Sequence, residues 1–267
     1  MLPIIRLGPF TLPTAPVVLL AMFFTLQEVG DRAAKRLKLP EGVVSTALFW
    51  TFGVGLVAAR LGYVARNVDA YLSDPLQIFG LNFGTLDLTT GALFGLVAGV
   101  AYLQRKKINV RLFADAMAPA LAFALAVYSF GNLLTGDAYG IRAPNLPWAI
   151  SLWGAMRHPT QVYELAAYLG IFAFVGFRAP RPFDGAHFLM TIALLAGVRV
   201  LFEPLRGDSV AWIAGLRSAQ VIAFGVMTLA LVLLAYGLRR SRLSGVTTPI
   251  VSTDSPVKPK ARRKKAL

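Results

Sequence analysis

The sequence predicts an all-α integral membrane protein that crosses the bilayer about seven times, with its N-terminus outside and its C-terminus in the cytoplasm. Three observations lead to this expectation. Among the 267 residues, 56% are hydrophobic and only 15% are charged, whereas roughly 25% are charged in a typical soluble domain. Long apolar runs recur along the chain. Lysine and arginine gather in alternate connections between these runs.

Seven apolar runs provide the expected membrane helices. A membrane-spanning helix needs about 20 mainly apolar residues, and roughly 17 suffice. The runs cover residues 15–29, 43–59, 88–104, 112–134, 161–177, 186–202 and 219–238, of which the first is the shortest. Residues 1–240 are therefore predicted to form a single transmembrane domain. Residues 241–267 have little to bury and are predicted to form a disordered basic tail in the cytoplasm.

The basic residues predict the orientation of these helices. The connections after the first, third and fifth runs, together with the chain after the seventh, hold 19 of the 27 Lys and Arg residues, whereas the opposite side holds 7. Basic residues are enriched on the cytoplasmic side of membrane proteins. This bias puts the N-terminus outside and the C-terminus inside, and an odd number of crossings satisfies that arrangement.

Composition also excludes several kinds of partner. The net charge is +14, but the basic residues lie between apolar runs and in the tail rather than on one amphipathic face, so we expect no nucleic-acid binding. The chain has no cysteine, which excludes disulfides, thiolate metal sites and a cysteine nucleophile of its own. It also lacks the sequence patterns of metal clusters and nucleotide cofactors. We therefore expect neither a metal nor a cofactor.

Polar residues concentrate in four segments at the predicted outer ends of the helices. These segments are RLGYVARN (60–67), SFGNLLTGDAYGIR (129–142), RHPTQVYE (157–164) and GVRVLFEPLRGD (197–208). A charged residue at mid-membrane costs about 2.5 to 3.5 kcal/mol and usually faces the interior of a helix bundle or a watery cavity. We therefore expect one shared polar pocket on the outer side.

Two of these segments have helical spacing. Arg199, Glu203 and Arg206 recur at i, i+4 and i+7, so on one helix they share a face, although Pro204 loosens the backbone there. They form either an ion pair that makes burial tolerable or an anion clamp, because arginine presents a planar fork of donors suited to phosphate.

The segment RHPTQVYE is interpreted as the start of a helix, because Pro159 suits a first helical turn. Gln161, Glu164 and Tyr168 then share one face and point an amide and a carboxylate into the pocket. His158, just before the proline, is either a general base or an interfacial histidine with a structural role. The segment GNLLTGD places Asn132, Thr135 and Asp137 at the end of the fourth run, where some of these side chains serve as helix caps.

Taken together, these segments resemble the bacterial prolipoprotein diacylglyceryl transferase family. RHPTQVYE is similar to the family's R-H-P-S-Q-x-Y-E, FGNLLTGDAYG to its G-N-F-x-N-x-E-x-x-G, and RVLFEPLRGD to its R-x-x-x-E-x-x-R. LGPFTL and ARLGYV resemble its early segments. These segments occur in the family's order over roughly residues 7–238.

The resemblance implies a multi-pass enzyme of the bacterial inner membrane that transfers diacylglyceryl from phosphatidylglycerol, or a related phospholipid, to the lipobox cysteine in the signal peptide of a preprolipoprotein. We expect it to act as a monomer. Arg199 matches a central arginine of the family, and His158 and Asp137 are the further catalytic candidates. The expected substrate-binding residues are Arg60, Asn132, Arg157, Gln161, Glu164, Glu203 and Arg206.

The chain departs from the family pattern at five positions. Thr90 stands where the family has a histidine, Ser129 where it has an arginine, and Leu195 where it has a tyrosine. Thr135 replaces an asparagine, and Asp137 shortens a glutamate. Two functions are therefore compared: a divergent diacylglyceryl transferase, and a catalytically inactive paralogue that binds a phospholipid headgroup or a lipoprotein precursor. A transporter is disfavoured because no inverted repeat is visible.

Overall fold

The structure is a computed structural model that describes residues 4–7, 10–72, 74–80, 83–176, 181–209, 211–213 and 215–243. Within these ranges, seven helices of 17 residues or more run along the chain. They are α1 (Thr14–Arg36), α2 (Val43–Arg66), α4 (Leu88–Arg105), α5 (Val110–Thr135), α6 (Thr160–Gly176), α7 (Ala186–Phe202) and α8 (Ser218–Leu243). Each corresponds to one predicted apolar run, although residue 177 of the fifth run lies outside the described residues.

These helices make the chain an all-α polytopic membrane protein. Among the described residues, α2, α5, α8 and the segment Ala186–Leu205 are long and apolar enough to cross a membrane, and α6 is apolar but shorter. The total of seven crossings, and the sides on which the two termini lie, stay predictions.

Helix α5 is the centre of the bundle. It packs against α1, α6 and α7, and α8 lies on α7. Alanine makes this close packing possible, because a row of α5 alanines is buried: Ala116, Ala118, Ala120, Ala122, Ala124 and Ala126. Large residues of the neighbouring helices, among them Tyr168, Ile171 and Val198, fill the space beside this row.

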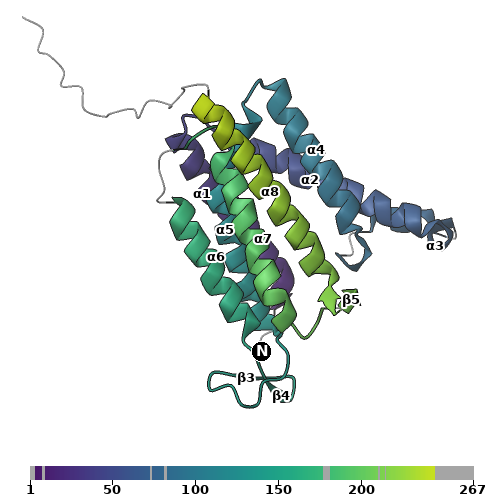
Figure 1. Cartoon of the computed structure of the whole chain (residues 1–267). Helices are drawn as coiled ribbons and strands as arrows, with labels where there is room; N and C mark the ends of the chain where they lie inside the picture. The colour runs from purple at the N-terminus through teal and green to yellow at the C-terminus, as the bar shows by residue number, and fades with distance from the viewer. Residues whose placement is uncertain are drawn as a thin grey trace, which may run out of the picture.

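Helices α2 and α4 form a separate pair that lies to one side of the bundle, with the short helix α3 (Val68–Leu72) at its far end (Figure 1). Glycines allow the two backbones to touch. A Cβ atom at Gly91 would lie 2.8 Å from the carbonyl oxygen of Gly55, and one at Gly95 would clash with that of Thr51. Such small residues at regular spacing are typical of helix contacts in lipid.

Short elements in the connections were not predicted. They comprise the antiparallel hairpins β1–β2 (Ile4–Leu7, Phe10–Pro13), β3–β4 (Ile150–Leu152, Ala155–Arg157) and β5–β6 (Ala211–Ile213, Leu216–Arg217), and the 3₁₀ turns η1 (Pro75–Phe79), η2 (Phe83–Thr85) and η3 (Glu203–Leu205). In β3–β4, Ile150 pairs with Arg157. This hairpin leads directly into α6.

Two predicted boundaries differ from the structure. Helix α7 ends at Phe202, so Arg199, Glu203 and Arg206 do not occupy one helix: Glu203 begins η3, and Arg206 is extended. Pro204 explains the change, because proline has no N–H for a helical hydrogen bond. Helix α8 continues to Leu243, so residues 241–243 are helical rather than part of the tail. Residues 244–267 lie outside the described residues.

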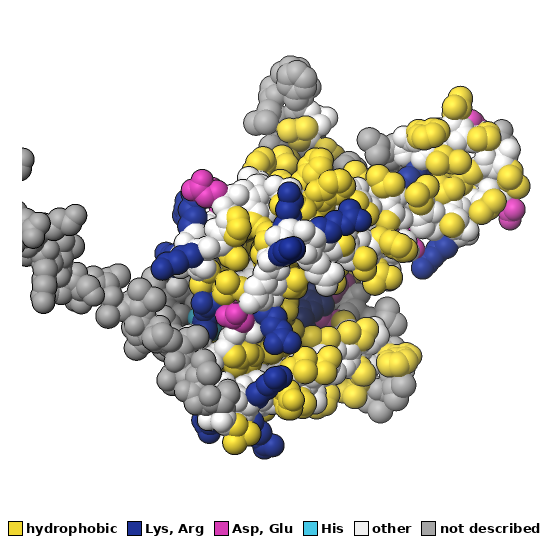
Figure 2. All heavy atoms as spheres, turned by 90° about the horizontal axis from the view of Figure 1, so that it is seen from above, with side chains coloured by type: hydrophobic (Ala, Val, Ile, Leu, Met, Phe, Trp, Pro, Cys, Tyr) yellow, Lys and Arg dark blue, Asp and Glu magenta, His cyan; other side chains and the backbone are white. Residues whose placement is uncertain are grey.

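The two ends of the bundle differ in their elements and in their charged side chains. The N-terminal end of the chain and the β3–β4 hairpin lie at one end, and the C-terminal end of α8 lies at the other (Figure 1). Figure 2, which looks onto that second end, shows many Lys and Arg side chains and few acidic ones. The four polar segments belong mainly to the opposite end, and the side of the membrane that each end faces stays a prediction.

Candidate functional site

A network of ion pairs lies where α6 begins and α7 ends. The guanidinium of Arg199 contacts Glu164 Oε1 at 3.1 Å and Glu203 Oε2 at 2.8 Å. Arg206 contacts the same Glu164 oxygen at 3.6 Å and Asp208 Oδ2 at 2.6 Å. Four of the predicted site residues therefore meet in one place, although the helix end at Phe202 brings Arg206 there by a turn rather than by helical spacing.

The two glutamates of the network are buried, whereas Arg199 and Asp208 are partly exposed. The side chains of Glu164 and Glu203 are 2% and 1% exposed, whereas that of Arg199 is 32% exposed. A guanidinium has five N–H donors, and the contacts with the two carboxylates involve only its two terminal nitrogens. The two buried carboxylates therefore fix the orientation of Arg199 and leave donors for a ligand on its open side. An ion pair and an anion-binding role are compatible here.

The charges of this network do not favour an anion by themselves. Two arginines, Arg199 and Arg206, stand against three carboxylates, those of Glu164, Glu203 and Asp208. The sequence did not predict Asp208 as a site residue, although it ends one of the four polar segments. Its place two residues after Arg206 could have indicated this ion pair. A phosphate ligand here would depend on directed hydrogen bonds more than on net charge.

Buried polar groups occur at the start of α6 and in the last turns of α5. Gln161 is fully buried, and its Nε2 donates to the carbonyl oxygen of Asp137 at 2.8 Å. Among the described residues, Gln161 Oε1, Asn132 Nδ2 and Ser129 Oγ have no hydrogen-bond partner. An unsatisfied buried polar group costs about 1 to 3 kcal/mol, so these atoms are suited to bind a polar ligand. Asp137 itself is exposed, and its carboxylate accepts from the Thr135 hydroxyl at 2.7 Å.

Arg157 and His158 stabilise the approach to α6. Arg157 Nε donates to the carbonyl oxygen of Leu152 at 3.0 Å, and its guanidinium lies 4.7 Å from the centre of the Tyr139 ring. The Nδ1 atom of His158 lies 3.5 Å from the hydroxyl of Tyr163. Arg157 thus braces the β3–β4 hairpin and the loop of Tyr139, and His158 lies against the first turn of α6.

Arg60 lies in a different polar centre, on the α2–α4 pair. Its Nε donates to the carbonyl oxygen of Ile78 at 2.8 Å, and its guanidinium also binds Gln77 and Thr85. The structure therefore assigns Arg60 to the connection between α2 and α4, and the prediction that it shares the pocket of Arg199 finds no supporting contact among the described residues.

Thr90, at the position of the family histidine, belongs to the same α2–α4 pair. Its hydroxyl donates to Asp87 at 2.8 Å and lowers the pKa of that carboxyl, which also contacts Arg66 at 3.1 Å. A Cβ atom at Gly62 would lie 2.8 Å from Thr90. Thr90 therefore packs tightly against α2, and its hydroxyl holds the side chain of Asp87, which caps α4.

Comparison with known proteins decides the family. The model of the family "Prolipoprotein diacylglyceryl transferase" matches residues 3–236. The chain belongs to this family. A phosphatidylglycerol–prolipoprotein diacylglyceryl transferase from Clostridioides difficile (strain 630) is 35% identical over 196 residues, which cover 73% of this chain and 78% of the relative. The protein of that name from Synechococcus elongatus is 28% identical over 276 residues, with 94% and 93% covered.

Membership in the prolipoprotein diacylglyceryl transferase family confirms the resemblance drawn from the four polar segments. The described part of the chain also has several helices that are long and apolar enough to cross a membrane, as a multi-pass membrane protein requires. Within the described residues, no group of three or more metal-binding side chains occurs.

Proposed function

We propose that the chain is a divergent phosphatidylglycerol–prolipoprotein diacylglyceryl transferase of the bacterial inner membrane, active as a monomer. The names of its relatives supply the reaction, and one observation supports it here: Arg199 is held between two buried carboxylates and remains 32% exposed. The buried and unpaired polar atoms of Asn132 and Gln161 lie at the same end of the bundle.

The proposed reaction is a nucleophilic displacement. The Sγ atom of the lipobox cysteine attacks the glycerol carbon of the diacylglyceryl group that is bonded to the phosphate oxygen. A C–S bond forms, the C–O bond to the phosphate breaks, and glycerol phosphate leaves with the bonding electron pair. The thiol, with an ordinary pKa of about 8.5, must lose its proton to a base. This chemistry needs cationic donors at the leaving phosphate and an acceptor for the proton.

The side chains divide into four roles in this proposal. Arg199, with Arg206 behind it, donates to the departing phosphate, and the free amide group of Asn132 and the free oxygen of Gln161 orient the polar headgroup. Glu164 and Glu203 position Arg199. The candidates for the base are His158, which lies against Tyr163, and Asp137, which is exposed at the end of α5.

The alternative is a lipid-binding paralogue without catalysis. The observation that favours it is the state of the two replaced positions. The Thr90 hydroxyl is engaged by Asp87, and Ser129 is fully buried with an unpaired Oγ. Neither threonine nor serine can supply the base or the cation that the family has at these positions.

A purified assay with phosphatidylglycerol and a lipobox peptide separates the two functions. We expect wild-type turnover to be weak, His158→Ala to lower it further, and Thr90→His combined with Ser129→Arg to raise it. Each single substitution is the control for the double variant. Because Thr90 packs against Gly62 and Ser129 is buried, the thermal stability of every variant is measured first.

The outcomes are distinct. Wild-type turnover equal to that of a standard family member, and unchanged in His158→Ala, would contradict the proposed need for a replacement base. If neither the wild type nor the double variant turns over while both bind phosphatidylglycerol, the paralogue is correct. Complementation of a strain depleted of its own transferase gives the same distinction in cells.

A further inference from the structure

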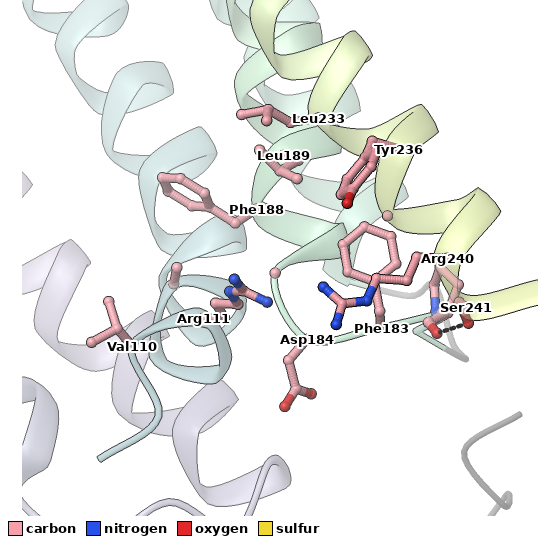
Figure 3. A pocket seen from close by; sticks show the side chains of 14 residues that line it. Val110, Arg111, Phe183, Asp184, Phe188, Leu189, Leu233, Tyr236, Arg240 and Ser241 are labelled. Atoms are coloured by element: carbon pink, nitrogen blue, oxygen red, sulfur yellow. Dashed lines mark hydrogen bonds between the residues drawn. The ribbon is translucent and has the colours of Figure 1, made fainter. Parts of the chain in front are cut away.

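A pocket of about 770 Å³ opens at the basic end of the bundle, opposite to the ion-pair network of Arg199. The start of α5, the segment before α7, and the last turns of α8 form its walls. In Figure 3, Arg111 from α5 and Arg240 from α8 lie on opposite sides of it, and Leu189 and Leu233 lie farther along α7 and α8. The transferase chemistry proposed above does not use this pocket.

The walls change from charged to apolar along the helix axes. On α8, Leu233 precedes Arg240 by seven residues, which corresponds to about 10 Å along a helix. On α7, which runs in the opposite direction, Phe188 and Leu189 follow the helix start and face the same space. Leu233 is 44% and Tyr236 is 64% exposed, so the apolar part is open on its membrane side. The pocket therefore offers a cationic mouth above an apolar groove.

The acidic groups near the mouth are already engaged. Asp184 accepts from Asn109 Nδ2 at 2.8 Å and lies 3.7 Å from Arg181. Asp115 is buried, accepts two backbone N–H groups, and lies 3.5 Å from the same arginine. Within the described part of the chain, no carboxylate lies within ion-pair distance of Arg111. Arg111 therefore brings to the mouth a positive charge that no described carboxylate pairs with.

We propose that this pocket binds one anionic phospholipid, with its phosphate between Arg111 and Arg240 and one acyl chain along Phe188, Leu189 and Leu233. In the predicted orientation this lipid belongs to the cytoplasmic leaflet, which is rich in anionic headgroups. The site is separate from the proposed reaction, which takes place at the other end of the bundle.

Charge favours a phospholipid over two other possible occupants of the pocket, a signal peptide and the basic C-terminal segment of this chain. The n-region of a bacterial signal peptide is positively charged, and residues 258–265 of this chain contain six basic residues. Arg111 and Arg240 would repel both. A phospholipid combines the negative group and the hydrocarbon chain that the two parts of the pocket require.

Native mass spectrometry of the full-length, delipidated protein tests the proposal. The protein is titrated with phosphatidylglycerol or with phosphatidylcholine of the same acyl chains. We expect the wild type to retain one tightly bound phosphatidylglycerol. In Arg111→Gln/Arg240→Gln, the affinity of the protein for this lipid should fall about thirtyfold, since each basic residue contributes about 1 kcal/mol. The control Arg105→Gln/Arg239→Gln removes two exposed charges from the same end, outside the pocket.

The absence of native cysteine permits a second, steric measurement. Leu233→Cys and Leu231→Cys place a thiol on α8 at positions that are 44% and 48% exposed, of which only the first lines the pocket. Labelling with a hydrocarbon maleimide at position 233 is expected to remove the tightly bound lipid, and labelling at position 231 to leave it. The label at position 233 fills the groove without changing any charge.

Three results would overturn the proposal. The first is equal loss of lipid in the pocket variant and in the control that lacks Arg105 and Arg239, which would indicate general surface attraction. The second is equal retention of phosphatidylcholine and phosphatidylglycerol. The third is unchanged lipid binding after the label is attached at position 233. Lipid binding to Arg199→Gln is measured in parallel, because this variant affects the Arg199 site and not the pocket. A negative result for the pocket can then be distinguished from a failure of the proposed function.

Discussion

At the scale of single residues, Arg199 determines whether the ion-pair network is functional. We expect Arg199→Ala to abolish turnover and to destabilise the protein by less than the 3 to 5 kcal/mol typical of a broken buried pair, because its side chain is 32% exposed. Arg199→Lys keeps the charge, but a single ammonium cannot replace the planar fork that contacts both Glu164 and Glu203, so we expect activity to stay impaired. Turnover and melting temperature are measured together.

The matched control is Arg32→Ala at the opposite end of the protein. Arg32 pairs with Glu28 at 2.8 Å, but both side chains are more than 60% exposed, and exposed pairs contribute about 0 to 1 kcal/mol. We expect this variant to behave as the wild type. A stable Arg199→Ala protein that binds and converts phosphatidylglycerol normally would leave Arg199 with only a structural role.

At the scale of elements, the start of α7 depends on a carboxylate from another helix. Asp115 of α5 accepts the backbone N–H groups of Gly185 at 2.8 Å and of Phe188 at 2.9 Å. We expect Asp115→Ala to leave two buried donors unsatisfied and to cost about 2 to 4 kcal/mol, measured as a fall in melting temperature. Asp115→Asn keeps an acceptor oxygen and should cost less.

The comparison for this prediction is Asn109→Ala, which removes the cap of α5 and one exposed hydrogen bond to Asp184 but leaves the two bonds that Asp115 accepts from Gly185 and Phe188. Loss of an ordinary cap costs about 1 kcal/mol. Equal destabilisation by Asp115→Ala and Asn109→Ala would contradict the importance of the contact between α5 and α7.

The sequence did contain a signal for Asp115, because it is an acidic residue inside an apolar run. Its partners could not be predicted, because they lie 70 or more residues away along the chain.

The α2–α4 pair depends on close contact of its backbones. In Gly95→Ala, the new methyl group would meet the carbonyl oxygen of Thr51, so we expect the two helices to separate locally at a cost of about 1 to 3 kcal/mol. The control is Gly53→Ala on α2, where a Cβ atom meets nothing within 4 Å. Limited proteolysis of the α2–α4 connection is the measurement, and equal digestion of both variants would contradict the prediction.

At the scale of the whole molecule, the basic end of the bundle is expected to face the cytoplasm. The measurement is labelling of single cysteines, Lys106→Cys and Ala155→Cys, by a membrane-impermeant thiol reagent in intact cells whose outer membrane is permeabilised. We expect the cysteine at position 155 to react and that at position 106 to be protected, because positive residues are retained inside. The reverse pattern would show that the orientation is inverted.

The sequence predicted the seven long helices because length and apolarity suffice to define a helix in lipid. It did not predict the hairpins, since strands of two to four residues carry no periodic pattern, or the end of α7, which Pro204 imposes. In the candidate site, Arg199, Glu164 and Glu203 were found because they interrupt apolar runs. Arg60 bonds to the connection between α2 and α4, and its place in the pocket of Arg199 stays a prediction, because motif order along the chain does not show how the α2–α4 pair lies relative to the bundle.

The attachment of α7 at both ends has a mechanical consequence. Its first turn is tied to α5 through Asp115, and its last turn is tied to α6 through Arg199 and Glu164. A rod fastened at two points to the same frame cannot tilt independently, so α5, α6 and α7 behave as one stiff unit. We therefore expect a motion that admits a bulky lipid to occur at the α2–α4 pair, which contacts the bundle mainly through α1.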